Sequence, residues 1–306
     1  MILIADSGST KCSWALCDKK GNLIEEISTI GFNPYFIEYD IIIAKLKKTQ
    51  LDKYKEHVTD VFFYGAGCSL LEKRKIIESP LRHFFKNANI NIRHDLEAAC
   101  LATYTGRENI TCILGTGSNS CFYNGKDITT HAPSLGFILG DEASGNYFGR
   151  KILNMYFNNL LTDELAKELE EEFETDISII QKNIYNNRAN VFLAKYFPFI
   201  IKNKNHPLIE ELIQNALAEF ITLHIKPFKK HQKIEINFIG SVAFFLSEEI
   251  EKIITKNNLK IGQIIKNPIQ KLITFHILKT NSEDTLYQPI EKFFPAGITT
   301  TRNTPV

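Results

Sequence analysis

Two stretches of the sequence follow the same order of elements: a strand, a turn containing glycine, a second strand, a hairpin turn and a third strand. The first, which opens with "MILIADSGSTK", covers residues 1–29, and the second, "NITCILGTGSNSCFYNGKDI", covers residues 109–128. They share this pattern and little residue identity. A unit that recurs along a chain predicts related structural units, so we expect two lobes built on the same plan.

Outside these stretches, expected strands alternate with expected helices, which indicates the α/β class. Apolar runs predict strands at 58–68, 89–95 and 234–241, and helices are expected at 39–48, 69–85, 96–104 and 243–258. Pro80 can break the second of these helices. Residues 141–229 are expected to be mostly helical.

A chain of 306 residues is long enough for two domains. We place an N-terminal lobe at 1–106 and a C-terminal lobe with a helical insertion at 107–276. The remaining residues, 277–306, are rich in Thr, Asn and Pro and have weak periodicity. We treat them as a tail of unknown role.

The charge balance argues against some partners. With 36 basic and 35 acidic residues the formal net charge is +1, whereas nucleic acids and anionic membranes are bound by concentrated positive charge. No apolar run reaches the ~18 residues of a membrane span, and the N-terminus lacks the pattern of a signal peptide, so we expect a cytoplasmic protein. The six cysteines form no C-x-x-C motif and are expected to be buried free thiols, with no disulfide framework or zinc site.

Three apolar strands are expected to run directly into a turn rich in glycine and hydroxyl side chains. The turns are "ADSGSTK" (Ala5 to Lys11), "LGTGSNS" (Leu114 to Ser120) and "IGSVA" (Ile239 to Ala243). Small residues let backbone N–H groups approach an anion, and hydroxyl groups add donors. One such turn is most often an ordinary hairpin, but three of them, each after an apolar strand, favour phosphate-binding sites.

Two acids lie at the ends of expected strands. Asp6 stands beside the first turn, where its carboxylate can bind Mg²⁺ directly or through water. The competing interpretation is turn capping, which is common for Asp. Asp95 closes one strand and begins a helix, so it can cap that helix or act as a general base toward an attacking hydroxyl group. These two roles of Asp95 do not exclude each other.

The most unusual stretch is "SLGFILGDEASGNYFG" (Ser134 to Gly149), because four glycines interrupt an apolar segment around Asp141 and Glu142. An Asp-Glu pair most often starts a helix, but between glycines it can project a carboxylate into a cleft and accept hydrogen bonds from a sugar. Asn33, in "GFNP" (Gly31 to Pro34), offers an amide in a loop that a proline restrains. On chemistry alone, an ordinary turn residue is the simpler interpretation of Asn33.

The chain resembles the N-acetylglucosamine kinases of the BadF/BadG-type ATPase family, part of the sugar kinase–actin–chaperone ATPase superfamily. Six short motifs, spread in the family's order over residues 1 to about 276, carry the resemblance. They are "DSGSTK" (Asp6 to Lys11), "GFNP" (Gly31 to Pro34), "DLEAA" (Asp95 to Ala99), "GTGSNS" (Gly115 to Ser120), "LGDEASG" (Leu139 to Gly145) and "GSVA" (Gly240 to Ala243). The first motif departs from the family's commoner Asp-Gly-Gly opening by a serine. The resemblance implies two actin-like (ribonuclease H-like) lobes with mixed sheets flanked by helices, and ATP in the cleft between them.

The resemblance also implies a role for each motif. The residues at the ATP phosphates would be Ser9, Thr10, Lys11, Gly115 and Thr116, those at the adenosine Gly240, Ser241 and Ala243, and those at the sugar Asn33, Asp95, Asn119 and Asp141. Asp6 would hold Mg²⁺, and Asp95 would be the catalytic base.

The implied reaction is ATP-dependent phosphorylation of the 6-hydroxyl group of an N-acetylated hexosamine, with N-acetylglucosamine as the first candidate. The sequence does not separate this sugar from N-acetylmuramic acid, N-acetylmannosamine or glucose. It also leaves open whether the protein forms a homodimer.

Three alternatives use a similar cleft. An activator ATPase of a radical dehydratase would need cysteines placed for an iron–sulfur cluster shared by two subunits. A non-catalytic sugar or nucleotide sensor would use the cleft as a switch, yet Asp6, Asp95 and Asp141 are all present, and no attached helix-turn-helix is expected. A glucokinase of the repressor-related type would carry a cysteine-rich zinc motif, which this sequence lacks.

Overall fold

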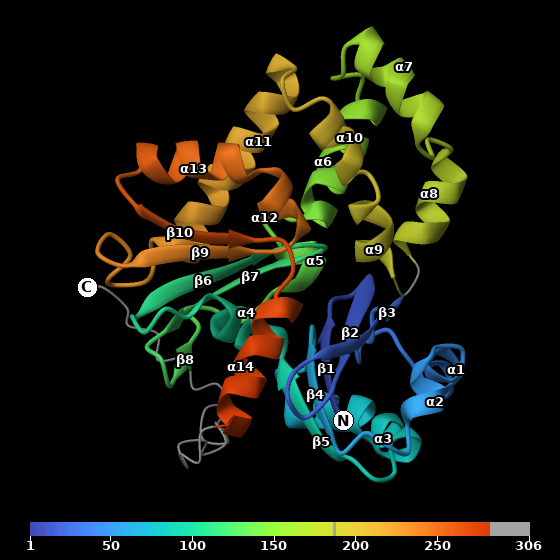
Figure 1. Ribbon diagram of the computed structural model, residues 1–306. Coiled ribbons are helices and arrows are strands. Elements are labelled where there is room, and N and C mark those ends of the chain that lie inside the picture. Colours follow the sequence, from blue (N-terminus) through green and yellow to red (C-terminus); the bar gives the residue numbers. More distant parts are fainter. Residues whose placement is uncertain (186–187, 282–306) are drawn as a thin grey trace, which may run out of the picture.

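Two five-stranded sheets form the framework of the computed structural model, which describes residues 1–185 and 188–281 (Figure 1). The first sheet has the order β3-β2-β1-β4-β5, with strands β1 (Ile2–Ser7), β2 (Lys11–Cys17), β3 (Leu23–Ile30), β4 (Asp60–Gly65) and β5 (Asn89–His94). The second has the order β10-β9-β6-β7-β8, with strands β6 (Asn109–Leu114), β7 (Ser118–Tyr123), β8 (Ile128–Thr129), β9 (Glu235–Ile239) and β10 (Lys260–Ile265).

The two sheets have the same topology. In each, the first strand pairs antiparallel with the second and the second antiparallel with the third. The first strand also pairs in parallel with the fourth, and the fourth in parallel with the fifth. The expected architecture, two lobes with mixed sheets flanked by helices, is therefore confirmed.

The helices flank these sheets (Figure 1). In the first half of the chain they are α1 (Tyr39–Lys47), α2 (Leu51–Tyr54), α3 (Leu71–Phe84), α4 (Asp95–Thr103), α5 (Gly136–Leu139) and α6 (Gly145–Phe157). Later come α7 (Asp163–Glu172), α8 (Ile177–Ile184), α9 (Ala189–Ala194), α10 (Phe197–Lys202), α11 (Pro207–Phe220), the π-helix η1 (Ile221–Ile225), α12 (Ser241–Phe245), α13 (Ser247–Lys256) and α14 (Ile269–Asn281). Within the described ranges, no helix combines the length and apolar character needed to cross a membrane.

Strand β1 is buried on both faces, because side chains alternate along a strand and helices cover each side of the sheet. Leu3 and Ala5 belong to the core that α1 and α3 close, whereas Ile2 and Ile4 belong to a second core with residues of α4 and α14. This burial explains why the apolar run at the start of the chain predicts a strand so clearly.

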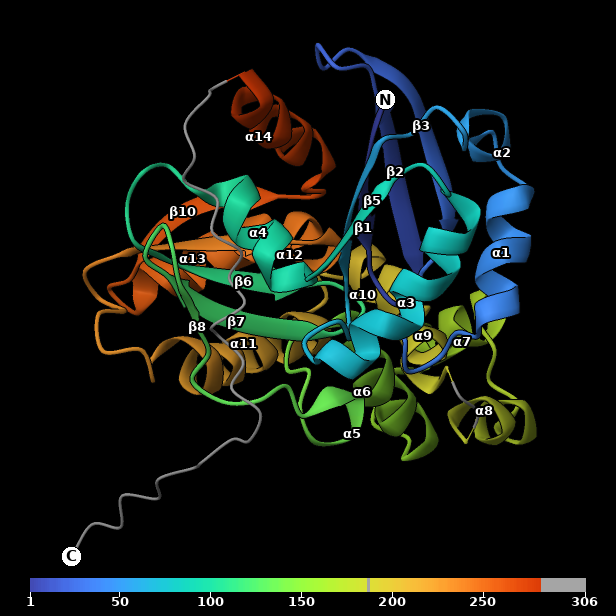
Figure 2. The same ribbon diagram turned by 90° about the horizontal axis from the view of Figure 1, so that it is seen from below.

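Helix α4 contacts strands of both sheets, and α14 returns from β10 to pack on α4, β1 and β2 (Figure 2). The return begins at Ile269, inside the segment that we assigned to the C-terminal lobe, so this helix joins the lobes. The boundaries at 106 and 276 stay a prediction. Residues 277–281 of the predicted tail continue α14, and residues 282–306 lie outside the described residues.

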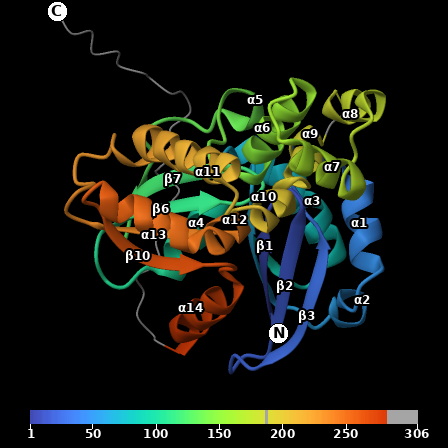
Figure 3. The same ribbon diagram turned by 90° about the horizontal axis from the view of Figure 1, so that it is seen from above.

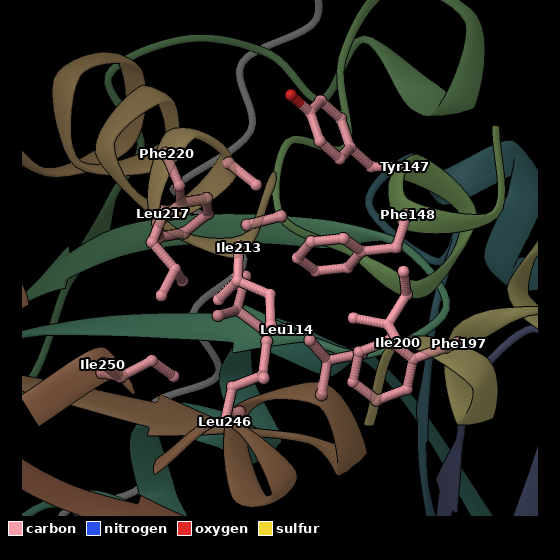
Figure 4. Packing of buried hydrophobic residues seen from close by; sticks show 14 of the residues in the cluster. Leu114, Tyr147, Phe148, Phe197, Ile200, Ile213, Leu217, Phe220, Leu246 and Ile250 are labelled. Carbon is pink, nitrogen blue, oxygen red and sulfur yellow. The ribbon is translucent and has the colours of Figure 1, made fainter. Parts of the chain in front are cut away.

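The second lobe has the largest core (Figure 4). Leu114, at the end of β6, packs there with Phe148 of α6 and Phe220 of α11. All three side chains are almost completely buried. Because Leu114 directly precedes Gly115, the second glycine turn is attached to a rigid core.

Some elements differ from the expectation. Helix α3 continues through Pro80, whose side chain is buried together with Ile77 and Leu81, so packing outweighs the lost backbone hydrogen bond. The helix expected at 243–258 is divided at the fully buried Leu246 into α12 and α13. Strand β10, which the sequence did not predict, contains a bulge stabilised by a hydrogen bond from Gln263 N to Asn237 Oδ1 (2.8 Å).

Candidate functional site

The first glycine turn is the tip of the β1–β2 hairpin. Gly8 N donates a hydrogen bond to Lys11 O (2.9 Å), which leaves Ser9 and Thr10 at the tip. Gly31 packs against this turn and donates from its N–H to Thr10 O (2.9 Å). A Cβ atom at Gly31 would lie 2.1 Å from Gly8 O, so only glycine permits this close approach.

The second glycine turn is the tip of the β6–β7 hairpin, and the N-terminus of α6 holds it. Gly115 N donates to Gly117 O (2.9 Å), Gly145 N donates to Gly115 O (2.8 Å) and Asn146 N donates to Thr116 O (3.1 Å). Asn146 Nδ2 donates to the same carbonyl oxygen (2.6 Å). The turn is therefore fixed by backbone contacts to a helix of its own lobe.

The two turns meet across the lobes, because Thr10 Oγ1 and Thr116 Oγ1 are hydrogen-bonded at 2.9 Å. Four backbone N–H groups in these turns have no acceptor among the described residues, namely those of Ser9, Thr10, Thr116 and Gly117. Lys11 is exposed beside them. Free N–H groups in adjacent tight turns, with a cation nearby, form a site suited to the oxygens of an anion.

The third turn, between β9 and α12, lies against the second. Gly240 has a φ of +122°, and a Cβ atom there would lie 2.2 Å from Leu114 O. Ser241 is exposed, whereas Ala243 is fully buried in the core of the second lobe. The side chain of Ala243 thus faces away from any ligand at the surface, and the adenosine contacts of these three residues stay a prediction.

The two acids Asp6 and Asp95 lie at the carboxyl ends of parallel strands in the first sheet. Ser7 is in register with Gly65, and Gly65 with His94, on three parallel strands. Asp6 precedes Ser7 and Asp95 follows His94, so the two residues are separated by two strand spacings across the sheet, about 10 Å, and are offset by two residues along it. Burial raises the pKa of Asp6 to about 7, and the negative charge of Asp95 contributes to this rise.

Asp95 is the first residue of α4, and our interpretation of it as the helix cap is wrong. The N-cap is His94, whose Nδ1 accepts a hydrogen bond from Leu96 N (3.3 Å) and whose backbone N–H binds the Glu97 side chain. Asp95 Oδ1 accepts from Leu96 N (2.9 Å). Its Oδ2 has no partner among the described residues, so the general-base role does not compete with capping.

Asn33 connects its loop to the first turn. Its Nδ2 donates to Ser9 Oγ (2.9 Å), and its Oδ1 accepts from Tyr35 N (3.0 Å). The side chain is buried. One Nδ2 proton remains available, and the sugar-binding role of Asn33 stays a prediction.

Asp141 is tied to the second turn. Its backbone lies in the left-handed region, with a φ of +61°. Oδ1 accepts from Ser118 N (3.1 Å), and Oδ2 accepts from Asn146 Nδ2 (2.7 Å). Burial raises the pKa of Asp141, and these two hydrogen bonds offset part of the rise. Asn119 is half-buried on β7, where its Oδ1 accepts from Ser120 N (2.9 Å). The predicted sugar contacts of Asp141 and Asn119 are not tested by this geometry.

Sequence reasoning missed several residues around the turns. Asn146 follows the "LGDEASG" motif directly, and its polar side chain in an apolar segment was an available signal. His224, in the π-helix, is paired with Glu142 at 2.7 Å, and π-helical turns are frequent at functional sites. Arg188 reaches the first turn from the helical insertion, where its Nη2 donates to Ser9 O (2.6 Å); no local pattern marks it.

Asp6 fits the role of a Mg²⁺ ligand. Its carboxylate has no hydrogen-bond or ion-pair partner within the described parts of the chain, and Mg²⁺ prefers oxygen ligands, typically one or two carboxylates with substrate phosphates. No cluster of three or more His, Cys, Asp or Glu residues suited to a metal occurs among the described residues. The six cysteines are buried free thiols, as expected, which removes the exposed cysteine ligands that the iron–sulfur alternative requires.

Comparisons with known proteins support the family and the fold. No protein-family model matches the chain. A solved structure from Porphyromonas gingivalis, provisionally assigned as an N-acetylglucosamine kinase, has 31% sequence identity and a TM-score of 0.84, over 91% of this chain and 99% of that one.

Two more distant structures support the fold alone. A protein from Chromobacterium violaceum with the same provisional assignment has 15% identity and a TM-score of 0.65, over 90% of this chain and 98% of that one. A ROK family glucokinase from Streptomyces griseus, solved with glucose and AMPPNP, has 13% identity and a TM-score of 0.53, also over 90% and 98%.

Proposed function

The chain belongs to the N-acetylglucosamine kinase family of the sugar kinase–actin–chaperone ATPase superfamily, and on this premise we propose that it is an ATP-dependent sugar kinase. The proposed reaction transfers the γ-phosphoryl group of ATP to the 6-hydroxyl group of an N-acetylated hexosamine, with N-acetylglucosamine as the first candidate. The cofactor is Mg²⁺ and the compartment is the cytoplasm.

The observation that carries this proposal is the meeting of the two glycine turns. One turn comes from each lobe, Thr10 and Thr116 are in contact, and the free N–H groups of both turns surround the contact. A triphosphate bound there would take hydrogen bonds from both lobes at once. Binding to both lobes couples nucleotide binding to lobe closure, which supports a kinase over a protein that binds nucleotide on one lobe.

Asp95 is the proposed general base. Its unpartnered Oδ2 would accept the proton of the 6-hydroxyl group as the hydroxyl oxygen attacks the γ-phosphorus atom. Mg²⁺, held through Asp6, would neutralise charge on the phosphate oxygens. The backbone N–H groups of the two turns would stabilise the charge that remains on the transferring group.

The sugar would lie on the side of the turns that carries Asp95. Asn33, Asn119 and Asp141 are the proposed contacts to its hydroxyl and N-acetyl groups. Because Asn33 and Asp141 also brace the first and second turns, a bound sugar would favour the arrangement in which both turns hold ATP. This coupling would limit hydrolysis of ATP by water in the absence of the sugar.

The test is ADP release by purified protein with ATP and Mg²⁺, without sugar and with each of four sugars. The sugars are N-acetylglucosamine, N-acetylmuramic acid, N-acetylmannosamine and glucose. We expect strong release with N-acetylglucosamine and weak release without sugar. Identification of the phosphorylated carbon by NMR of the product would then test transfer to the 6-hydroxyl group.

Two outcomes would contradict the proposed kinase activity, and a third would contradict only its substrate class. ADP release that no sugar changes would favour an ATPase that acts on a partner protein. Binding of ATP and sugar without any turnover, by protein whose Asp95 is intact, would favour a sensor. Faster ADP release with glucose than with any N-acetylated sugar would support a sugar kinase but would contradict the proposed N-acetylated substrate.

A further inference from the structure

Arg188 is a cation at the first glycine turn that neither the motifs nor the proposed mechanism accounts for. It is the N-cap residue of α9, and its Nη2 donates to the backbone oxygen of Ser9 at 2.6 Å. Its Nε is buried and has no hydrogen-bond partner among the described residues. A buried N–H of a charged group without an acceptor is costly, so this N–H is suited to donate to an acceptor on a ligand bound at the turn.

Arg188 comes to this turn as part of the second lobe. Helix α9 packs closely on α6: a Cβ atom at Gly149 would meet Leu193 O at 1.9 Å, and one at Gly145 would lie 3.2 Å from the Ala194 Cβ. Gly145 also holds the second turn through its hydrogen bond to Gly115 O. Helix α9, α6 and the second turn therefore form one packed unit, in which α6 and α9 lie side by side (Figure 3). The hydrogen bond to Ser9 O places Arg188 of this unit at the tip of the β1–β2 hairpin.

The charge of Arg188 has no opposite charge paired with it within residues 1–185 and 188–281. No carboxylate among the described residues lies within ion-pair distance of its guanidinium group, whereas Arg74 and Arg93 are each paired with Glu97 and Arg82 with Glu78. Its one printed contact at the turn is Ser9 O, and the same turn carries the free N–H groups of Ser9 and Thr10. An unpaired guanidinium beside free N–H groups matches a doubly or triply charged phosphoryl group, whose oxygens accept from several donors.

We propose that Arg188 binds the γ-phosphoryl group of ATP and stabilises its charge during transfer. The inference rests on the proposed kinase function. In the step, the bond between the γ-phosphorus and the β–γ bridging oxygen breaks and a bond to the sugar oxygen forms. The hydroxyl proton goes to Asp95 and ADP leaves with the bridging oxygen; Arg188 keeps its proton throughout and donates hydrogen bonds only.

The position of Arg188 also gives it a role in lobe closure. It belongs to the second lobe and contacts the first, so its bond to a phosphate held by the β1–β2 turn would link both lobes through the group that is transferred. ADP lacks this group. The closed arrangement of the lobes would therefore depend on bound ATP. After transfer of the γ-phosphoryl group, Arg188 would lose this link and the lobes would be free to open.

The first experiment measures binding of ATP and of ADP, each with Mg²⁺ and without sugar, by isothermal titration calorimetry. Arg188→Gln is compared with the wild type and with Lys195→Gln, which removes the exposed positive charge of the C-cap residue of the same helix. We expect ATP affinity to fall about 10- to 100-fold in Arg188→Gln, the effect of one lost charged hydrogen bond. ADP affinity should stay within about twofold, and Lys195→Gln should match the wild type.

The second experiment measures turnover with the sugar identified above. Arg188→Gln should lower kcat by about 10²–10³-fold, as the loss of one donor to transition-state charge does, and Arg188→Ala should regain part of its activity in added guanidinium. A residue that only braces the turn would not respond to guanidinium. Arg188→Lys keeps the positive charge but loses the planar guanidinium group. Its kcat should therefore lie between the values for the wild type and for Arg188→Gln.

Three results would overturn the inference: equal losses of ATP and ADP affinity, unchanged affinity for both, or no ATP binding by the wild type. The first would make Arg188 a structural clamp on Ser9. Because nucleotide binding is measured without sugar, a protein that binds ATP but phosphorylates none of the sugars would contradict the proposed function and leave this comparison intact.

Discussion

The two glycine turns sit at equivalent places in two sheets of the same topology, yet they are held in different ways. The β1–β2 turn is braced by Gly31 and the Asn33 side chain of its own lobe and by Arg188 of the other lobe. The β6–β7 turn is fixed within its own lobe, by α6 and the Asp141 carboxylate. The second turn is thus built to be rigid, and the first to respond to the position of the second lobe.

The chemistry is also unequally divided. The acids proposed for catalysis and metal binding, Asp95 and Asp6, both lie at the edge of the first sheet. At the equivalent end of the second sheet, strand β7 begins with the hydroxyl of Ser118 and the amide of Asn119, and the nearby Asp141 carboxylate is occupied by Ser118 N and Asn146 Nδ2. The repeated fold therefore provides two similar glycine turns, and the carboxylates without a hydrogen-bond partner that we propose for metal binding and catalysis lie beside the first of them.

The largest expected effect tests whether the carboxylates beside the first turn carry the catalysis. Asp95→Asn should lower kcat by about 10²–10⁴-fold, the usual cost of losing a general base, with sugar and nucleotide binding largely kept. The matched control is Asp60→Asn, at the opposite end of β4 in the same sheet, which should retain full kcat. Full activity in Asp95→Asn would remove Asp95 from the role of base.

The next largest effect is expected on stability, at the two glycines that pack against the first and second turns. A Cβ atom would overlap Gly8 O in Gly31→Ala and Leu114 O in Gly240→Ala, at 2.1 and 2.2 Å. Such overlap should lower the free energy of unfolding by about 1–3 kcal/mol in both, and Gly240→Ala should lose more because its φ is positive. Gly106→Ala is the control, since its φ is also positive but nothing lies within 4 Å of the new Cβ. Denaturant unfolding measures all three.

If both turns bind phosphate, Gly31→Ala and Gly240→Ala should also raise the KM for ATP. Gly106→Ala, which lies outside the three glycine turns of the proposed site, should leave this KM unchanged. A raised KM in only one variant would show that the turns do not share the triphosphate.

A smaller effect concerns the pH dependence that Asp6 gives to the first lobe. Its pKa is raised from 3.8 to about 7, so between these values the folded protein holds a proton that the unfolded chain releases. Without Mg²⁺, the free energy of unfolding should therefore fall as the pH rises through this window. Binding of Mg²⁺ together with ATP needs the ionised form of Asp6. The affinity of the protein for the Mg²⁺–ATP complex should therefore rise about tenfold from about pH 6 to about pH 8.

Asp6→Asn provides the control for this pH dependence, because the nucleotide itself also titrates near neutral pH. The stability change and the gain in affinity that depend on Asp6 should both disappear in this variant, as measured by thermal unfolding and calorimetry. A tenfold gain that survives in Asp6→Asn would come from the nucleotide and not from this acid.

The smallest effect belongs to the contact between the turns. Thr10→Val and Thr116→Val each remove the hydrogen bond between the two hydroxyl groups, which should cost about 0.5–1.5 kcal/mol at most. A double-mutant cycle on ATP binding should give a coupling energy within this range. A coupling near zero would indicate that the turns bind ATP independently.

Local patterns in the sequence predicted much of the framework. The strands β1, β2, β6 and β7 follow from apolar runs next to glycine turns, and four of the six buried thiols belong to cysteines in these strands. Repetition of the same pattern predicted two lobes. These features depend on contacts between residues close in sequence, so a single sequence contains enough information for them.

Contacts between distant residues escaped the same reasoning. Helix α14 packs on β1, which is separated from it by most of the chain, and β10 is held by a bulge that Asn237 stabilises. Both outcomes depended on what the tertiary structure placed nearby. The His94 cap of α4 was missed for another reason: it is a local contact, with Leu96 N two residues away, but no propensity rule ranks His first as a cap.

The sequence by itself determined the repeated strand–turn plan, the glycines that keep the turns open and the acids beside them, because spacing and residue type alone carry these features. Only the tertiary structure decided which groups face one another at the turns. It brought Thr10 to Thr116, bound Asp141 to Asn146, and delivered Arg188 to Ser9 across 179 positions of the chain. Packing of α9 on α6 set the last of these contacts, and packing between distant elements follows from the shape of the folded lobes.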